Sequence, residues 1–192
     1  LFPQQMTFWS SEDIQPEFNF DGELLFKSSR GLEARMYEIY HLNPGITIPQ
    51  KIPTQQEYHG YPGPSPDGKH VVFNSRVVDE EGISRMEIFT ANITTGETQR
   101  LTYSPSFDDS GRWSPDGSEI IFYSDRDGTM DLWKISVNES GYPTGSAVKV
   151  FGSDAREHCG RWSFDGQYIV YESDKSGINH LWMITSDGLN DV

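Results

Sequence analysis

The sequence lacks the features that mark several common classes of protein. It has one cysteine, Cys159, so no disulfide can form within the chain, and a lone cysteine is usually a small packing residue. No apolar run is long enough to span a bilayer as a helix. The chain also has no Gly-x-Ser-x-Gly nucleophile motif, Walker loop, Rossmann glycine set or zinc-ligand pair at the usual spacing. We therefore expect neither a disulfide scaffold nor a membrane span, and we expect no enzyme of these classes.

Basic residues are scarce. The chain has 15 Lys and Arg against 29 Asp and Glu, a formal net charge of −14. Nucleic acid is therefore excluded as an expected partner, because phosphate binding needs a basic surface. The simplest interpretation is a solvated acidic surface that favours solubility, and the alternatives are cation binding or a salty environment.

Helical periodicity is missing too, and a repeat of about 49 residues takes its place. An Asp-Gly turn marks each copy: Asp21-Gly22, Asp67-Gly68, Asp116-Gly117 and Asp165-Gly166. Each turn is followed by a short apolar run, a serine, a polar turn and an aliphatic-aromatic pair. Short segments rich in β-branched and aromatic residues, bounded by turn residues, are typical of antiparallel strands. Four such strands per repeat predict an all-β, four-bladed β-propeller with four-stranded antiparallel blades.

The frame of the repeat gives the N-terminus a special role. Ile52, Leu101 and Val150 are each predicted to lie in the last strand of a repeat, and each precedes the next Asp-Gly turn by the same number of residues. Met6 precedes the first Asp-Gly turn by that same number. The strand Gln4 to Trp9 is therefore predicted to be the outer strand that the last blade lacks. It covers an open sheet edge either in its own chain or in a neighbour. The whole chain, 1–192, reads as one domain with this strand at 3–9 and blades at about 16–55, 60–104, 109–153 and 158–192.

These motifs resemble a known family of repeats. Ser65-Pro66-Asp67-Gly68, Trp113-Ser114-Pro115-Asp116-Gly117 and Trp162-Ser163-Phe164-Asp165-Gly166 are similar to the propeller repeats of TolB, which also occur in prolyl oligopeptidase-like enzymes and oligogalacturonate lyases. The resemblance implies the fold, since blade motifs are packing motifs. TolB has a six-bladed ring and a further domain, and it binds proteins in the periplasm. The four repeats of this chain depart from that pattern.

One constellation suggests a metal site. Equivalent positions before the four Asp-Gly turns hold Asp13, His59, Asp108 and Glu157, which would lie on a circle near one mouth of the channel. Oxygen ligands suit Ca²⁺, whereas His59 better suits a transition metal. The adjacent positions hold Ile14, Gly60, Asp109 and His158, so a shift of one residue changes the set. A hydrated polar rim is the alternative interpretation, and a divalent cation such as Ca²⁺ is the cofactor that this hypothesis names.

The N-terminal strand is the second candidate site. Phe2, Met6, Phe8 and Trp9 make it unusually apolar, so it is predicted to be an assembly strand that adds to the sheet of a neighbour. A donated strand makes a head-to-tail contact, which propagates into a filament unless the rotation closes. The sequons at Asn92 and Asn138 are candidate glycosylation sites.

We therefore expect a non-catalytic structural or interaction protein. The chain begins with Leu1 rather than Met, which favours a processed and exported chain, extracellular or periplasmic. The expected partner is the protein itself, as a homopolymer, or another envelope protein. Two alternatives remain: a monomeric ligand- or metal-binding propeller that uses the channel mouth, and a remnant of a polysaccharide lyase or peptidase-like enzyme.

Overall fold

The computed structural model describes residues 5–8, 10–19, 21–30, 36–56 and 58–189, and this part of the chain forms four antiparallel sheets. The first contains β1 (Asp13–Phe18), β2 (Leu24–Ser28), β3 (Glu38–Leu42) and β4 (Gln50–Lys51). The second contains β5 (Gly60–Pro64), β6 (His70–Val78), β7 (Ser84–Asn92) and β8 (Thr98–Arg100). The third contains β9 (Asp108–Trp113), β10 (Glu119–Ser124), β11 (Asp131–Ser136) and β12 (Val148–Phe151). The fourth contains β13 (Glu157–Trp162), β14 (Tyr168–Ser173) and β15 (His180–Thr185).

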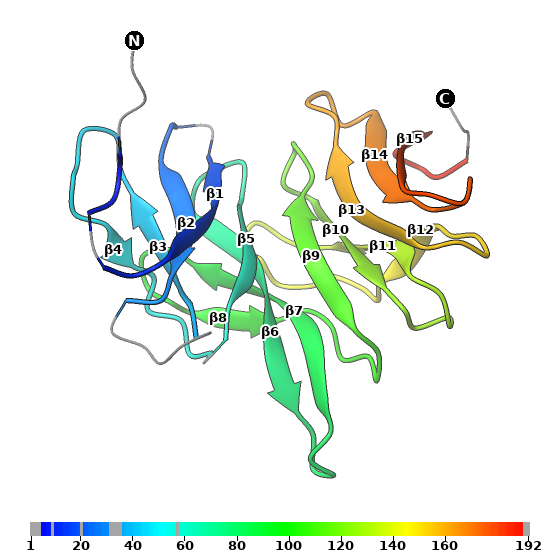
Figure 1. Ribbon diagram of the computed structural model, residues 1–192, viewed down its shortest axis with the longest axis horizontal. Helices are drawn as coiled ribbons and strands as arrows, with labels where there is room; N and C mark the ends of the chain where they lie inside the picture. The colour runs from blue at the N-terminus through cyan, green and yellow to red at the C-terminus, as the bar shows by residue number, and fades with distance from the viewer. Residues whose placement is uncertain (1–4, 9, 20, 31–35, 57, 190–192) are drawn as a thin grey trace.

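Each sheet is one blade, and consecutive strands pair in chain order. Strand contacts join blade one to blade two, two to three and three to four, with the first strands β1, β5, β9 and β13 adjacent in that order. Figure 1 shows blade one (β1–β4) and blade four (β13–β15) on opposite sides of the molecule, with blades two and three between them. The predicted all-β, four-bladed propeller is confirmed.

The Asp-Gly turns repeat one hydrogen-bonding pattern. In blades two to four the serine before the turn donates to the aspartate at 2.6 Å, as Ser114 does to Asp116. The same hydroxyl accepts the backbone N–H of the residue that begins the next strand, such as Glu119 at 3.0 Å. The glycine has a positive φ, 75° at Gly117, which glycine adopts at little cost. The turn therefore fixes where the second strand of a blade starts.

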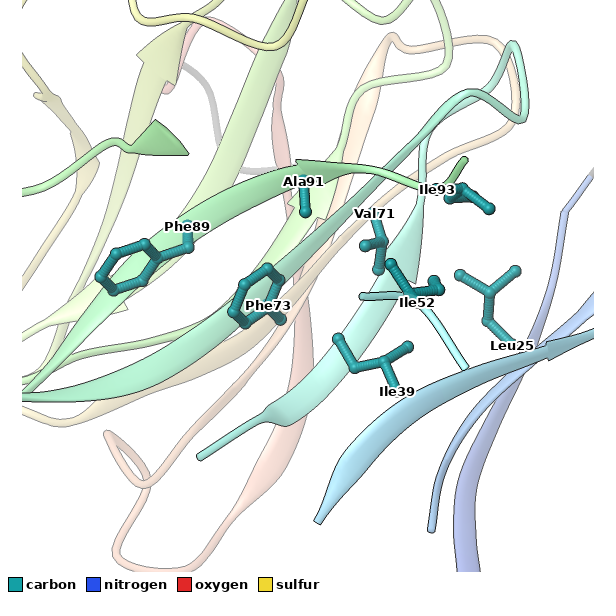
Figure 2. Close-up of a cluster of buried hydrophobic side chains, with 8 residues drawn as sticks. All are labelled: Leu25, Ile39, Ile52, Val71, Phe73, Phe89, Ala91 and Ile93. Atoms are coloured by element: carbon teal, nitrogen blue, oxygen red, sulfur yellow. The ribbon is translucent and has the colours of Figure 1, made fainter. Parts of the chain in front are cut away.

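The core lies between the blades. Figure 2 shows the first of three clusters, where Leu25, Ile39 and Ile52 of blade one face Val71 and Phe73 of blade two. Two further clusters join blades two and three and blades three and four. Alternate residues of a strand point to opposite faces, so each blade packs on the preceding blade with one face and on the following blade with the other. The recurring tryptophans pack at these joints, Trp133 as a core residue and Trp113, Trp162 and Trp182 at the margins.

The fourth blade has three strands in the part of the chain that the structure describes. Residues 5–8 of the predicted N-terminal strand belong to no sheet, and Gln4 and Trp9 lie outside the described residues. The edge of β15 is thus not covered by residues 5–8 of the same chain. Donation of this strand to a neighbour stays a prediction. The described residues also contain no helix of the length and apolarity that a membrane crossing requires.

Candidate functional site

Three of the predicted metal ligands, His59, Asp108 and Glu157, are buried, and the fourth, Asp13, is half-buried. Asp108 accepts two hydrogen bonds from Nη2 of Arg126, at 2.8 and 2.9 Å. Glu157 accepts from the hydroxyls of Ser153 at 2.7 Å and Ser173 at 3.1 Å. Each of these carboxylates stands opposite the serine that ends the neighbouring strand, so both tie a blade together internally.

Asp13 likewise bonds within its own blade, where it accepts from Arg30, whereas His59 at the start of blade two bonds to blade one. Burial opposes ionisation of Asp13, but hydrogen bonds from Ser28 and Thr7 and the charge of Arg30 outweigh burial and lower its pKa. His59 donates from Nδ1 to the carbonyl of Tyr37 at 2.9 Å, and burial lowers its pKa. Among the described residues, the side chains that come within 4.8 Å of one another as a possible metal-ligating group are others, so the four predicted ligands are not brought together as one set.

Most of the polar and titratable side chains near the axis lie one and two residues after these four positions, in the first strand of each blade. A β-bulge interrupts the pairing there, because each register shifts within the same stretch of the repeat. The residue in the bulge has a positive φ in all four blades: Gln15 (54°), Tyr61 (48°), Ser110 (58°) and Cys159 (56°). A left-handed conformation is rare outside glycine. Its recurrence at one position in all four blades shows that it is part of the structure of the repeat.

We call the residues at this level the axial layer. Each blade contributes the bulge residue, the residue before it and the partner of that residue on the second strand. The members are Ile14, Gln15 and Lys27; Gly60, Tyr61 and Asn74; Asp109, Ser110 and Tyr123; and His158, Cys159 and Glu172.

Interactions between blades draw the axial layer together. The N–H of Tyr61 donates to Oε1 of Gln15 at 2.9 Å, and Nη1 of Arg112 donates to the Tyr61 carbonyl at 3.0 Å. The ring of Tyr123 meets that of His158 edge to face at 6.1 Å. The layer is therefore a connected polar centre shared by all four blades.

Burial dominates the electrostatics of this centre. It raises the pKa of Asp109 to about 6, although Tyr123, Arg112 and Lys27 favour the carboxylate. Burial lowers the pKa of Lys27 and, together with Asp109, raises that of Tyr123. Burial and then Glu172 raise the pKa of the Cys159 thiol. A thiol with a raised pKa is protonated at neutral pH, so Cys159 is not an activated nucleophile.

The Asp109 carboxyl gives the first testable prediction. Its pKa rises on folding from 3.8 to about 6, so the folded protein keeps a proton that the unfolded chain loses between these values. The stability of the wild type relative to Asp109→Asn therefore falls as pH rises through this window, by up to about 3 kcal/mol in total. Urea denaturation of both proteins at pH 4 and pH 7.5 measures this change. An unchanged difference between the two pH values would show that Asp109 titrates normally.

A hollow of about 280 Å³ opens at the Asp-Gly end of the inner strands. Arg112 and Arg161 line it together with the rings of Trp113 and Trp162. The Arg112 guanidinium lies 3.6 Å from Glu17, and burial lowers its pKa to about 10, so it stays charged at neutral pH. Guanidinium groups and aromatic rings are side chains that can recognise anionic or aromatic groups of a ligand.

One packing face of blade four is not covered by another blade among the described residues. One repeat position holds Ile39, Ile88 and Leu132, which are 0% exposed, because the next blade and an outer-strand residue cover each of them. The same position in blade four is Leu181, which is 75% exposed. Val170 is likewise more exposed than its equivalents in the other blades. It is half-buried, whereas Leu25, Val72 and Ile121 are fully buried. This face therefore has the composition of a blade joint, although no blade packs on it in the described part of the chain.

The remaining predicted residues lie at the surface or outside the described chain. Met6 and Phe8 are exposed, while Phe2 and Trp9 fall outside the described residues. The side-chain oxygens of Asn92 and Asn138 accept backbone N–H groups in their own turns, for example that of Ser140 at 3.0 Å. Glycosylation at both asparagines stays a prediction.

The sequence does not predict the axial layer as a unit. The slipped set that contains Asp109 and His158 was the nearest signal to it. Cys159 was expected to be an inert packing residue, yet it is half-buried beside His158 and Glu172. Strand alternation places adjacent residues on opposite faces, and nothing in the sequence announces the bulge that changes this.

Comparisons with known proteins agree with the architecture. The family model described as the TolB beta propeller domain matches residues 49–191. A TolB-type protein of Agrobacterium tumefaciens has a similar structure, with a TM-score of 0.74 and 24% identity over 92% of this chain and 62% of that one. TolB of Acinetobacter baumannii gives a TM-score of 0.75 and 22% identity over 95% of this chain and 42% of that one. A comparison with curated protein sequences gave no match.

A peptidase is among the more distant structural relatives. The puromycin-hydrolyzing peptidase of Mycobacterium tuberculosis gives a TM-score of 0.68 at 12% identity, over 95% of this chain and 30% of that one. The chain thus spans between about a third and three fifths of the lengths of these relatives, and their likeness concerns the fold. The family match covers most of the chain, and on that ground the protein belongs to the TolB β-propeller domain family.

Proposed function

We propose that this protein is a non-catalytic interaction propeller that acts outside the cytoplasm and assembles with copies of itself. In this proposal the N-terminal segment of one copy becomes the fourth strand of blade four in the next copy. The observation that carries the proposal is the uncovered face and open edge of blade four, with Leu181 75% exposed at a position that is elsewhere fully buried.

The repeat frame names the contact that would cover Leu181. The outer-strand residues Ile52, Leu101 and Val150 belong to the same clusters as Ile39, Ile88 and Leu132. Met6 stands at the outer-strand position of the repeat and is 55% exposed. A donated N-terminal strand would therefore place Met6 on Leu181 of the neighbour, and both apolar side chains would leave water.

The contact would be head to tail. The donor uses its N-terminal segment and the acceptor uses β15, so the two surfaces differ. The donor keeps a free β15 edge, and the acceptor keeps a free N-terminal segment. Such heterologous contacts extend into a filament unless the rotation closes a ring. Main-chain hydrogen bonds along β15 would supply affinity, and the alternate apolar side chains would fix the register.

A charge at either half of this contact tests the proposal. We expect the wild type to form assemblies larger than one chain in light scattering, and both Met6→Lys and Leu181→Lys to remain single chains, because a buried unpaired ammonium is strongly unfavourable. The variant Tyr103→Lys, at an exposed site of the loop after β8, is the control and should assemble normally. A wild type that stays a single chain at high concentration would refute self-assembly.

A further inference from the structure

We propose that His158, Cys159 and Glu172 bind a divalent transition-metal ion, Zn²⁺ by preference, at the axis of the propeller. One ligand atom from each residue lies within 4.8 Å of the other two. Among the described residues, these three form the group of His, Cys, Asp or Glu side chains in which the ligand atoms of at least three residues all lie this close together. The inference concerns blade four alone and does not depend on self-assembly.

Backbone geometry brings the three side chains together. His158 and Cys159 are adjacent in β13, so in a regular strand they would point to opposite faces of the sheet. The β-bulge at this point, with Cys159 at φ 56°, breaks the alternation and lets both side chains serve one site. Glu172 pairs directly with His158 across the β13–β14 ladder and supplies the third ligand.

The distances suit a small four-coordinate ion. Bonds of about 2.0–2.3 Å in tetrahedral geometry place ligand atoms about 3.3–3.8 Å apart. Nδ1 of His158 lies 3.6 Å from Oε2 of Glu172, within that range. The remaining separations of up to 4.8 Å would close by a side-chain movement of about 1 Å, which half-buried side chains can make.

The ligand types select the class of metal. A thiolate and an imidazole favour Zn²⁺ and similar borderline ions, whereas Ca²⁺ and Mg²⁺ prefer oxygen alone. Binding requires the Cys159 thiol to lose its proton, which is released to solvent as the metal–sulfur bond forms. Three protein ligands leave a fourth position for water or for a group of a partner.

The other blades show that the set is particular to blade four. The equivalent triplets are Ile14, Gln15 and Lys27 in blade one, Gly60, Tyr61 and Asn74 in blade two, and Asp109, Ser110 and Tyr123 in blade three. None of these offers three metal-ligating side chains. They also provide substitutions that the repeat already accommodates: Cys159→Ser copies Ser110, including its positive φ, and Glu172→Asn copies Asn74.

Titration with Co²⁺ and Zn²⁺ tests the site. We expect one Co²⁺ per chain, with a thiolate-to-metal charge-transfer band that Zn²⁺ displaces. Cys159→Ser should abolish the band, and Glu172→Asn should weaken binding by more than about tenfold, since even residues behind the ligands change metal affinity about 10–100-fold. The exposed His180 on β15 supplies the control, because His180→Asn should bind as the wild type does.

Protection of the thiol provides a second readout that does not depend on metal spectra. Saturating Zn²⁺ should slow alkylation of Cys159 in the folded wild type, and the protection should be lost in His158→Ile, which copies Ile14. Absence of the charge-transfer band, or alkylation at one rate with and without Zn²⁺, would overturn the proposal.

Discussion

Phe73→Ala is expected to lower the free energy of unfolding by about 3–5 kcal/mol, the usual cost of truncating a buried phenylalanine. Phe73 is fully buried in the joint between blades one and two. Its ring lies 5.1 Å from that of His59 and 5.8 Å from that of Phe89. Truncation would leave a cavity at a joint that two blades share, and rigid sheets on either side cannot collapse into it.

Urea denaturation of Phe73→Ala and of Phe18→Ala measures this cost against a matched control. Phe18 is also a phenylalanine, at the end of β1 in blade one, but it is 69% exposed, so its removal should change stability by less than about 0.5 kcal/mol. Equal effects of the two substitutions would show that inter-blade packing does not hold the propeller together.

Asp108→Asn should cost about 3 kcal/mol, at the lower end of the range for breaking a buried ion pair. The Asp108 carboxylate is fully buried and accepts two hydrogen bonds from Arg126, whose side chain keeps some contact with solvent. Arg126 also lies over the ring of Trp133, 4.6 Å from its centroid. Neutralising Asp108 would therefore leave a cation held against the core of blade three without its counter-charge.

The matched control for Asp108→Asn is Asp127→Asn. Asp127 pairs with Lys149 at 2.7 Å, but both side chains are exposed, so its loss should cost less than about 1 kcal/mol. Thermal and urea denaturation of both variants provide the comparison. A destabilisation by Asp108→Asn as small as that of the control would indicate that Asp108 is free to serve as a metal ligand.

The sequence predicts most of the fold because the repeat is regular. The Asp-Gly turns and the apolar runs after them occupy the predicted positions, since each has a local cause in turn chemistry or strand alternation. Val150 lies in β12 as predicted, whereas Ile52 and Leu101 directly follow β4 and β8, and all three are buried in the joints. The recurrence of tryptophan at two positions likewise predicts packing between blades.

The candidate site was harder to predict. Asp108 and Glu157 recur at equivalent positions because each blade needs a buried acceptor at the start of its inner strand. Recurrence predicts a ring of ligands, although the same pattern arises when these carboxylates each accept hydrogen bonds within their own blade. The axial layer depends on a β-bulge. A bulge changes the face of the sheet to which a side chain points, and the amino-acid pattern does not reveal it.

A disulfide between Met6→Cys and Leu181→Cys tests self-assembly most directly. The double variant is made with Cys159→Ser, oxidised at moderate concentration and separated without reductant. Strand donation predicts a ladder of covalent multimers that is absent when Met6→Cys is combined with Tyr103→Cys. A cross-link confined to single chains, or no cross-link at all, would contradict assembly through the open edge of blade four.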